Sequence, residues 1–442
     1  MNDRQTEQIT NEETYRRISA VVAGGVSSTM RAVAIPRPLV VRRAEGCQLW
    51  DVEGNMLIDL NMGYGPHLFG YADHEVLDDV AEQFRNGHMT GFPHELDYRA
   101  GELITELMPS IEQVRFANSG TEAITSAIRL ARATTERPLL LTFEGHYHGW
   151  SETVLRAGKL GSEPARQGDG PPAPGALGMI PEALNSTLQI PWNDPDALEE
   201  VFASHGDRIA AVIAEPVMGN SGVVLPLPGY LGQLREITRR HGSILIFDEV
   251  ITGFRVALGG AQQRYEVTPD LTILSKVLGG GIPVAAFGGS REVMALLAEN
   301  KALHAGVYAG NHASVRAVVS TLEKIRRRPQ VYADLEALGE YAQGQIHEAF
   351  AAEDRHVLVQ RAGSLMSVAL LTRPVDPSAP LREVRAAIDF DGHRQLQMAA
   401  QTLGLYFHPN PLEPWFLSTA HTHDDLAKVV ATLRLALSGL RR

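Results

Sequence analysis

The chain has 442 residues, a length that predicts more than one hydrophobic core. Hydrophobic residues make up 44% and charged residues 21%, the ordinary balance of a globular protein. The formal net charge of −12 argues against nucleic acid and anionic membranes as general partners, and the single cysteine, Cys47, excludes an intramolecular disulfide and a multi-cysteine zinc site. The polar start of the chain, and the lack of any apolar stretch near the ~18 residues of a membrane helix, lead us to expect a cytoplasmic protein.

A few short elements precede a long region of alternating patterns. Residues 15–22 have helical spacing, and residues 39–60 predict a hairpin meander with a Glu-Gly-Asn turn. Continuous apolar runs then alternate with helical segments, which predicts strands buried on both faces and an α/β fold with a mostly parallel sheet between helices. These runs are residues 114–117, 139–143, 209–214, 244–247, 271–274 and 284–287.

The composition also suggests how the chain is divided. Residues 161–178 are half Gly or Pro and predict a long loop, a kind of segment that often has a function such as a lid. After about residue 320 the pattern changes to helices with a few strands, which predicts a smaller α+β unit. We therefore expect an N-terminal segment (1–70) packing with the small domain, a large domain (71–320) and a C-terminal small domain (321–442).

The first candidate site directly follows residues 114–117. Asn118-Ser119-Gly120-Thr121-Glu122 opens a helical pattern, and small residues at a helix N-terminus offer backbone N–H groups and a positive dipole to a phosphate. The same residues also suit a plain helix N-cap, with Ser119 as the cap and Glu122 as its capping-box partner. The residues alone leave both interpretations open.

Two further strand ends carry candidate residues. Residues 144–150 contain Tyr147, whose ring can lie flat on a planar cofactor or pack the sheet edge. His146 and His148 have no evident third ligand, so we expect no metal. After the next strand, Asn220 can hydrogen-bond a ring hydroxyl or belong to an ordinary Asn-Ser-Gly turn.

Lys276 and Asp248 form the most informative pair. Lys276 follows the 271–274 run and precedes three glycines, and Asp248 ends the 244–247 run. Pyridoxal phosphate requires a lysine that holds its aldehyde as a Schiff base and a carboxylate that keeps its pyridine nitrogen protonated. A carboxylate at the end of a buried strand is costly without a cation, and the protonated pyridine would be one. The alternative for Lys276 is a surface lysine beside a glycine-rich turn.

These motifs occur in the order and spacing of one family. Residues 118–123, 146–149, 215–216, 247–255 and 275–281 resemble the class III pyridoxal phosphate-dependent aminotransferases of fold type I, and within them the glutamate-1-semialdehyde aminomutase-like group. The resemblance runs from about residue 20 to about residue 430. It implies a large domain with a mostly parallel seven-stranded sheet, a smaller α+β domain, and a homodimer with its active site at the subunit interface.

The resemblance also implies roles for individual residues. Lys276 would form the Schiff base and carry a proton during catalysis, and Asp248 would pair with the pyridine nitrogen. A neighbouring subunit would bring residues 306–311 to the phosphate, where Val307 replaces the family's threonine and offers a backbone N–H but no hydroxyl. The remaining cofactor contacts would come from Ser119, Gly120, Thr121, Tyr147, Asn220 and Val250.

The predicted substrate residues point to an amine that carries a carboxylate. Ser28 and Arg31 match the residues that hold the substrate carboxylate in the aminomutase group, and a guanidinium binds a carboxylate bidentately. Glu413 matches an acidic residue that faces the substrate's amino end in that group. Tyr64 replaces the family's tryptophan, and with Met62 and Trp150 it suggests an aromatic or apolar wall.

The loop at 161–178 favours one of two reactions. A mutase must retain its intermediate, whereas a transaminase must release its keto product. The resemblance implies that the aminomutases have a short, serine-containing loop here, which acts as a gate over the intermediate. The loop in this chain is longer and rich in Pro and Gly. We therefore expect a ping-pong aminotransferase that moves an amino group between an amino acid donor and a keto acid acceptor. The alternative is glutamate-1-semialdehyde 2,1-aminomutase, which transfers the amino group within one molecule.

Two other classes are less favoured. A nicotinamide-dependent dehydrogenase needs Gly-x-Gly-x-x-Gly after its first strand, and the chain has no such motif there. A non-catalytic pyridoxal phosphate-binding protein remains the third hypothesis. The presence of both Lys276 and Asp248, and the absence of an appended DNA-binding domain, argue against it.

Overall fold

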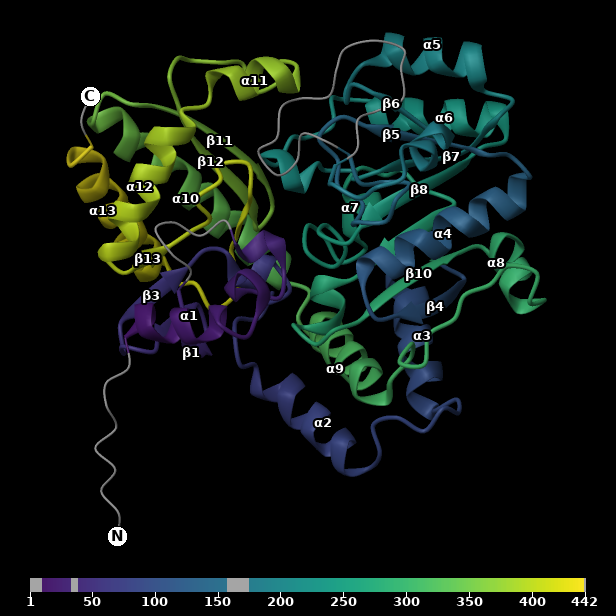
Figure 1. The fold of residues 1–442 in the computed structure, drawn as a ribbon, viewed down its shortest axis with the longest axis horizontal. Coiled ribbons are helices and arrows are strands. Elements are labelled where there is room, and N and C mark those ends of the chain that lie inside the picture. Colours follow the sequence, from purple (N-terminus) through teal and green to yellow (C-terminus); the bar gives the residue numbers. More distant parts are fainter. Residues whose placement is uncertain (1–9, 33–38, 157–174, 441–442) are drawn as a thin grey trace.

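The computed structural model describes residues 10–32, 39–156 and 175–440. Its centre is a seven-stranded sheet with the order β4-β10-β9-β8-β7-β5-β6 (Figure 1). Strand β10 is antiparallel to both of its neighbours, and every other pair in this sheet is parallel. This arrangement confirms the predicted α/β fold with a mostly parallel sheet. The strands are β4 (Gln113–Ala117), β5 (Leu139–Phe143), β6 (Thr187–Ile190), β7 (Ile209–Ala214), β8 (Ile244–Glu249), β9 (Leu271–Leu274) and β10 (Ala285–Gly289).

Helices cover both faces of this sheet, because side chains of a strand point alternately to its two faces. In β8, Ile244 and Ile246 belong to the hydrophobic cluster that contains α4 (Gly120–Thr135) and α8 (Arg291–Ala298). Leu245 and Phe247 belong to the cluster that contains α5 (Pro195–His205) and α6 (Tyr230–His241) on the other face. All four β8 side chains are buried, which explains the continuous apolar run in the sequence.

A second group of helices joins the large sheet to the C-terminal part of the chain. Helices α2 (His74–Arg85) and α3 (Glu95–Leu107) pack against α9 (His312–Arg327), and α10 (Val331–Ala352) follows α9 directly. The C-terminal part continues with β11 (His356–Ala362), β12 (Leu365–Leu371), α11 (Leu381–Ala387), α12 (Phe390–Thr402), β13 (Leu405–Tyr406), β14 (Trp415–Phe416) and α13 (His423–Ser438). Strands β11, β12 and β14 form an antiparallel sheet.

The N-terminal part contains α1 (Asn11–Ser19) and the strands β1 (Val41–Glu45), β2 (Gln48–Asp51) and β3 (Met56–Asp59). These strands pair antiparallel, as the predicted hairpin meander requires, and β13 adds to β3 in parallel. The division at residues 70 and 320 stays a prediction. Most of the predicted loop at 161–178 lies outside the described residues. In the described ranges, no helix combines the length and apolarity that crossing a membrane requires.

Candidate active site

Two adjoining pockets open at the carboxyl ends of the parallel strands, where ligands bind in such sheets. We call the first the inner pocket, and seven predicted cofactor residues line it: Gly120, Thr121, Tyr147, Asn220, Asp248, Val250 and Lys276. We call the second the outer pocket, and all four predicted substrate residues line it: Ser28, Arg31, Tyr64 and Glu413. The two pockets share Tyr147, Asn220, Ile251 and Lys276.

Some predicted residues lie elsewhere. Ser119 is the N-cap of α4, where its Oγ accepts the Glu122 N–H at 3.3 Å, and it does not line the inner pocket. Val307 is 76% exposed and lines neither pocket of this single chain. Met62 is fully buried in the core and Trp150 is exposed, and neither lines the two pockets of this single chain.

The N-terminus of α4 forms one end of the inner pocket. Gly120 and Thr121 are the first helical residues, so their backbone N–H groups lie at the positive end of the helix dipole. Gly149 packs directly against Thr121, and a Cβ at Gly149 would lie 3.1 Å from the Thr121 Cα. The helix N-terminus therefore combines a cap by Ser119 with a cradle that a phosphate could fill, so the two interpretations of this motif are compatible.

Asp248 is the last residue but one of β8, and its side chain is almost completely buried. Its Oδ1 accepts the Val250 N–H at 3.1 Å, and its Oδ2 lies 2.8 Å from His148 Nδ1. Because an ionised carboxylate only accepts hydrogen bonds, His148 donates from Nδ1 and fixes the carboxylate in place. The sequence analysis considered His148 only as a possible metal ligand and did not predict this pairing.

Glu249 points to the other face of β8 and has a structural role. Its carboxylate accepts the backbone N–H groups of Ala261 and Gln262 and the Thr252 hydroxyl. It therefore caps the short helix α7 (Gly260–Arg264) rather than lining either pocket.

Glu215 belongs to the 215–216 motif, but the sequence analysis gave it no role. It follows β7, and its buried carboxylate accepts the Tyr147 N–H at 2.7 Å and the Gly219 N–H at 3.0 Å. The Asn220 side-chain amide donates to the same carboxylate at 3.0 Å. Glu215 therefore fixes two walls of the inner pocket, Tyr147 and Asn220, relative to each other.

Lys276 begins a 3-10 turn after β9, with its backbone at φ +48. A non-glycine residue in this left-handed region is strained by roughly 1 kcal/mol or more. Residues with such strained backbones are found most often at functional sites. Burial lowers the pKa of Lys276 to about 8, although the carboxylates of Glu413, Glu215 and Asp248 act in the opposite direction. Its Nζ lies 5.8 Å from the centre of the Phe416 ring.

The inner pocket fits pyridoxal phosphate. The α4 N-terminus suits the phosphate, the buried Asp248 carboxylate suits a protonated pyridine, and the Lys276 amine suits the aldehyde. Tyr147 and Val250 provide aromatic and apolar walls. The fold and this set of residues define a pyridoxal phosphate-dependent enzyme of fold type I.

Comparison with known proteins gives the family. The model of the family described as Aminotransferase class-III matches residues 30–432, and the chain belongs to this family. A glutamate-1-semialdehyde 2,1-aminomutase from Thermomicrobium roseum is 41% identical over 95% of this chain and 96% of its own. These findings confirm the predicted family, enzyme class and cofactor.

Solved structures of two kinds resemble the chain. An omega-transaminase from Sphaerobacter thermophilus has a TM-score of 0.88 and 31% identity over 99% of both chains. A glutamate-1-semialdehyde-aminomutase from Pseudomonas aeruginosa PAO1 has a TM-score of 0.81 and 26% identity over 97% of this chain and 94% of its own. The names of the sequence relatives favour the aminomutase alternative over the ping-pong aminotransferase that the loop at 161–178 suggested.

Proposed function

We propose that the chain is a glutamate-1-semialdehyde 2,1-aminomutase, which converts glutamate-1-semialdehyde into 5-aminolevulinate with bound pyridoxal phosphate. The observation that carries the proposal is the composition of the outer pocket. Ser28, Arg31 and Glu413, which match residues of the aminomutase group in sequence, all line this one pocket. The relative from Thermomicrobium roseum, which spans nearly the whole chain and carries that name, supports the same conclusion.

In this proposal the inner pocket holds and activates the cofactor. Bound pyridoxal phosphate supplies a ring that accepts the electrons left when a proton leaves the substrate carbon. Asp248 would keep the ring nitrogen protonated, and His148, 2.8 Å from the carboxylate, would hold it for that task. Tyr147 and Val250 would flank the ring, Asn220 would face its hydroxyl, and Gly120 and Thr121 would hold the phosphate, with Ser119 as the cap of their helix.

Lys276 moves the proton. With a pKa of about 8, its Nζ is neutral in a substantial fraction of molecules near neutral pH, whereas an ordinary lysine is almost fully charged. A neutral Nζ would take the proton from the substrate carbon that bears the amino group, and the resulting ammonium would deliver the same proton to the cofactor carbon attached to that nitrogen. Burial of the side chain therefore prepares Lys276 for acid–base work.

The outer pocket selects the substrate. Arg31 and Ser28 bind its carboxylate, because a guanidinium presents paired donors that match carboxylate oxygens. Glu413 is buried and acts electrostatically on Lys276, so a substrate amino group beside Lys276 would also lie near this negative charge. A substrate with an amino group at one end and a carboxylate at the other would place its positive charge near Glu413 and its negative charge near Arg31.

A ping-pong aminotransferase is the second candidate. The observation in its favour is the TM-score to the omega-transaminase, 0.88, against 0.81 for the aminomutase structure. The sequence also departs from the aminomutase pattern in the loop at 161–178 and at Tyr64, which stands where the family usually has tryptophan.

Isomerisation of a single substrate separates the two functions. Holoenzyme incubated with glutamate-1-semialdehyde alone should form 5-aminolevulinate without a keto acid, and Lys276→Ala should abolish the reaction. If 5-aminolevulinate is not formed but an amino acid transfers its amino group to an added keto acid, the aminotransferase is the correct function. Turnover by Lys276→Ala at the wild-type rate would contradict both.

We also propose that the enzyme acts as a homodimer, with residues 306–311 of one subunit completing the phosphate site of the other. Val307 and Tyr308 in this segment are 76% and 64% exposed in the single chain, which leaves them available for such a contact. Sedimentation should give a species of twice the 48.1-kDa chain. A monomer that binds the cofactor stably would contradict this arrangement.

A further inference from the structure

Arg255 lies behind the outer pocket and carries a buried charge that no carboxylate neutralises. Its side chain is 1% exposed, and it lines neither the inner nor the outer pocket. Among the described residues no carboxylate forms an ion pair with its guanidinium, and burial lowers its pKa to about 10. Because an unpaired charge is costly to remove from water, the fold alone would favour an apolar side chain at this position.

The guanidinium donates to three acceptors that lie far apart in the sequence. One of its amino groups donates to Ser364 Oγ at 3.0 Å and to the Leu417 carbonyl at 3.1 Å. The other donates to the Gly65 carbonyl at 2.6 Å. Ser364 lies in the turn between β11 and β12, Leu417 directly follows β14, and Gly65 belongs to a turn after β3. One planar side chain therefore joins the N-terminal part of the chain to the C-terminal sheet.

The ring of Phe416 packs between the same segments. The guanidinium carbon of Arg255 lies 5.2 Å from the centre of this ring. A Cβ built at Gly65 would overlap the ring, so the turn can approach Phe416 this closely only because residue 65 is glycine. The Phe416 N–H also donates to the Leu60 carbonyl at 2.7 Å. Arg255, the Gly65 turn and Phe416 thus form one closely packed unit.

This unit determines the shape of one side of the outer pocket. Tyr64 and Phe416 both line that pocket, and each is next in sequence to a carbonyl that accepts from Arg255. The centre of the Phe416 ring lies 5.8 Å from Lys276 Nζ. A shift of either backbone segment would therefore change the pocket beside the reactive lysine.

We propose that Arg255 is a positioning residue that holds Tyr64 and Phe416 together as one wall of the outer pocket and thereby strengthens substrate binding without touching the substrate. The proposal rests on the outer pocket as the substrate site of the proposed function. When the wall is already fixed, binding does not have to order it, and the affinity is higher. The cofactor does not depend on this wall, because neither Tyr64 nor Phe416 lines the inner pocket.

Arg255→Lys tests this role, with 4-aminobutyrate as a probe that has an amino group at one end and a carboxylate at the other. Lysine keeps the charge, but its single ammonium group cannot bridge three acceptors as a planar guanidinium does. We expect the variant holoenzyme to bind 4-aminobutyrate roughly tenfold more weakly by calorimetric titration, the effect of losing one charged hydrogen bond. Its apoenzyme should bind pyridoxal phosphate with the wild-type dissociation constant in equilibrium dialysis.

Arg137→Lys is the matched control for a general loss of stability. Arg137 also donates to three backbone carbonyls, those of residues 206, 209 and 241, and it lines neither pocket. This variant should unfold at a lower urea concentration than the wild type and leave both dissociation constants unchanged.

Gly65→Ala disturbs the same wall with Arg255 intact, and it keeps the proposal testable if Arg255→Lys does not fold. The added methyl group would push against the Phe416 ring, so we expect the same selective loss of affinity for 4-aminobutyrate. Gly54→Ala is its control, because Gly54 has φ +91, close to the φ +100 of Gly65, but no atom within 4 Å of an added Cβ. This control should leave both dissociation constants unchanged.

Three outcomes would overturn the proposal: a wild-type enzyme that does not bind 4-aminobutyrate, variants at Arg255 and Gly65 that bind it as tightly as the wild type, or an equal loss of affinity for 4-aminobutyrate and pyridoxal phosphate. Equal losses would mean that Arg255 supports the fold in general. The titration requires binding but no particular reaction. Failure to isomerise glutamate-1-semialdehyde therefore refutes the proposed function, whereas an unchanged affinity for 4-aminobutyrate refutes the positioning role.

Discussion

At the scale of single residues, opposing electrostatic effects determine the protonation of Lys276. Burial disfavours its ammonium form, while the carboxylates of Glu413, Glu215 and Asp248 favour it, and burial prevails. The Arg255 guanidinium, which is buried and lies over the same Phe416 ring, lowers the Lys276 pKa further. A change in any one of these charges should therefore move the pH at which Lys276 becomes neutral.

Glu413→Gln should lower the pKa of Lys276, because the substitution removes a negative charge that stabilises the ammonium. The neutral amine is the form that reacts with an aldehyde. Uptake of pyridoxal phosphate by wild-type apoenzyme, followed by visible absorbance, should accelerate as the pH rises through about 8. In the variant this midpoint should shift to lower pH. An unchanged midpoint, or one as strongly shifted in the exposed Glu340→Gln control, would contradict the account.

The sequence predicted Lys276 and Asp248 because each directly follows an apolar strand, and parallel strands bring their carboxyl ends together. The His148–Asp248 pair could not be predicted in this way, because β5 and β8 are separated in the sheet by β7. The opposite orientation of Glu249 follows from the alternation of side chains along a strand, and this signal was available in the sequence.

At the scale of elements, the phosphate cradle depends on how closely the loop after β5 approaches α4. Gly149 has φ +84, and its Cα hydrogens face the Thr121 side chain without space for a methyl group. A side chain at this position would have to move the first turn of α4, which carries Gly120 and Thr121.

Gly149→Ala should weaken pyridoxal phosphate binding on the order of tenfold or more, the effect of overpacking by 1–3 kcal/mol. Gly229→Ala separates this clash from backbone strain, because Gly229 has φ +83 but no atom within 4 Å of an added Cβ. Equilibrium dialysis of both apoenzymes gives the comparison. Equal cofactor affinities in the two variants would show that the close approach of Gly149 to Thr121 is unimportant.

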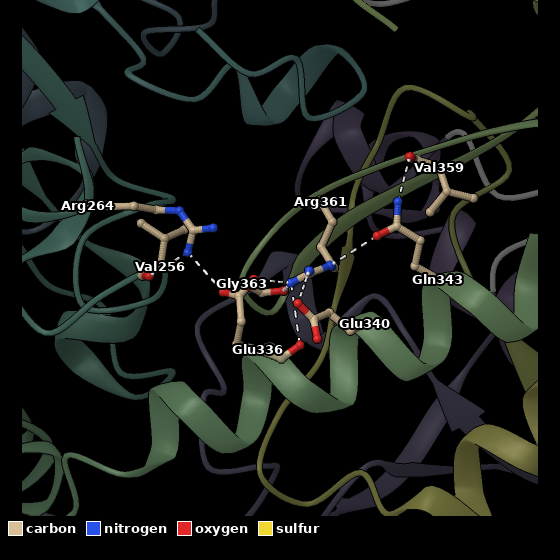
Figure 2. A network of polar contacts seen from close by, with 8 residues as sticks. All are labelled: Val256, Arg264, Glu336, Glu340, Gln343, Val359, Arg361 and Gly363. Carbon is tan, nitrogen blue, oxygen red and sulfur yellow. Dashed lines mark hydrogen bonds and ion pairs between the residues drawn. The ribbon is translucent and has the colours of Figure 1, made fainter. Parts of the chain in front are cut away.

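At the scale of the whole molecule, a polar network connects α7, which lies between two strands of the large sheet in the sequence, to α10 and β11 in the C-terminal part (Figure 2). Glu336 on α10 accepts from Arg264 of α7 at 3.0 Å and from Arg361 of β11 at 2.5 Å. Arg361 also donates to the Gly363 carbonyl and to Gln343. One carboxylate thus joins α7 to α10 and β11, two consecutive elements that lie about 70 or more positions further along the chain.

Glu336→Gln should therefore lower stability in a pH-dependent manner. Burial tends to raise the Glu336 pKa, but its hydrogen bonds with Arg264 and Arg361 lower it overall below the ordinary 4.5. A carboxyl with a depressed pKa contributes stability above its ordinary pKa and loses that contribution as the pH falls through the folded-state pKa. The wild-type advantage in urea midpoint should be present at pH 7 and shrink below pH 4.5.

Glu199→Gln, which disrupts an exposed pair with Arg240, is the control and should have little effect at either pH. A wild-type advantage over Glu336→Gln that is the same at all pH values would mean that the charge of Glu336 does not matter.

Most of the large sheet could be predicted from the sequence, because strands buried on both faces appear as uninterrupted apolar runs. The strand β6 was missed since its residues, Thr187–Ile190, mix polar and apolar side chains at the sheet edge. The reversed direction of β10 was also missed, because strand direction depends on chain connectivity and leaves no trace in composition. The pairing of β13 with β3 joins residues more than 300 positions apart, beyond the reach of any local pattern.

The claim that Lys276 binds the cofactor is tested most directly by chemical trapping. Reduction of the holoenzyme with borohydride makes a Schiff base permanent, and peptide mass mapping then identifies the labelled lysine. We expect a pyridoxyl group on Lys276, and no such group in the Lys276→Ala protein treated in the same way. Labelling of a different lysine, or an unlabelled Lys276 in protein that retains the cofactor, would contradict it.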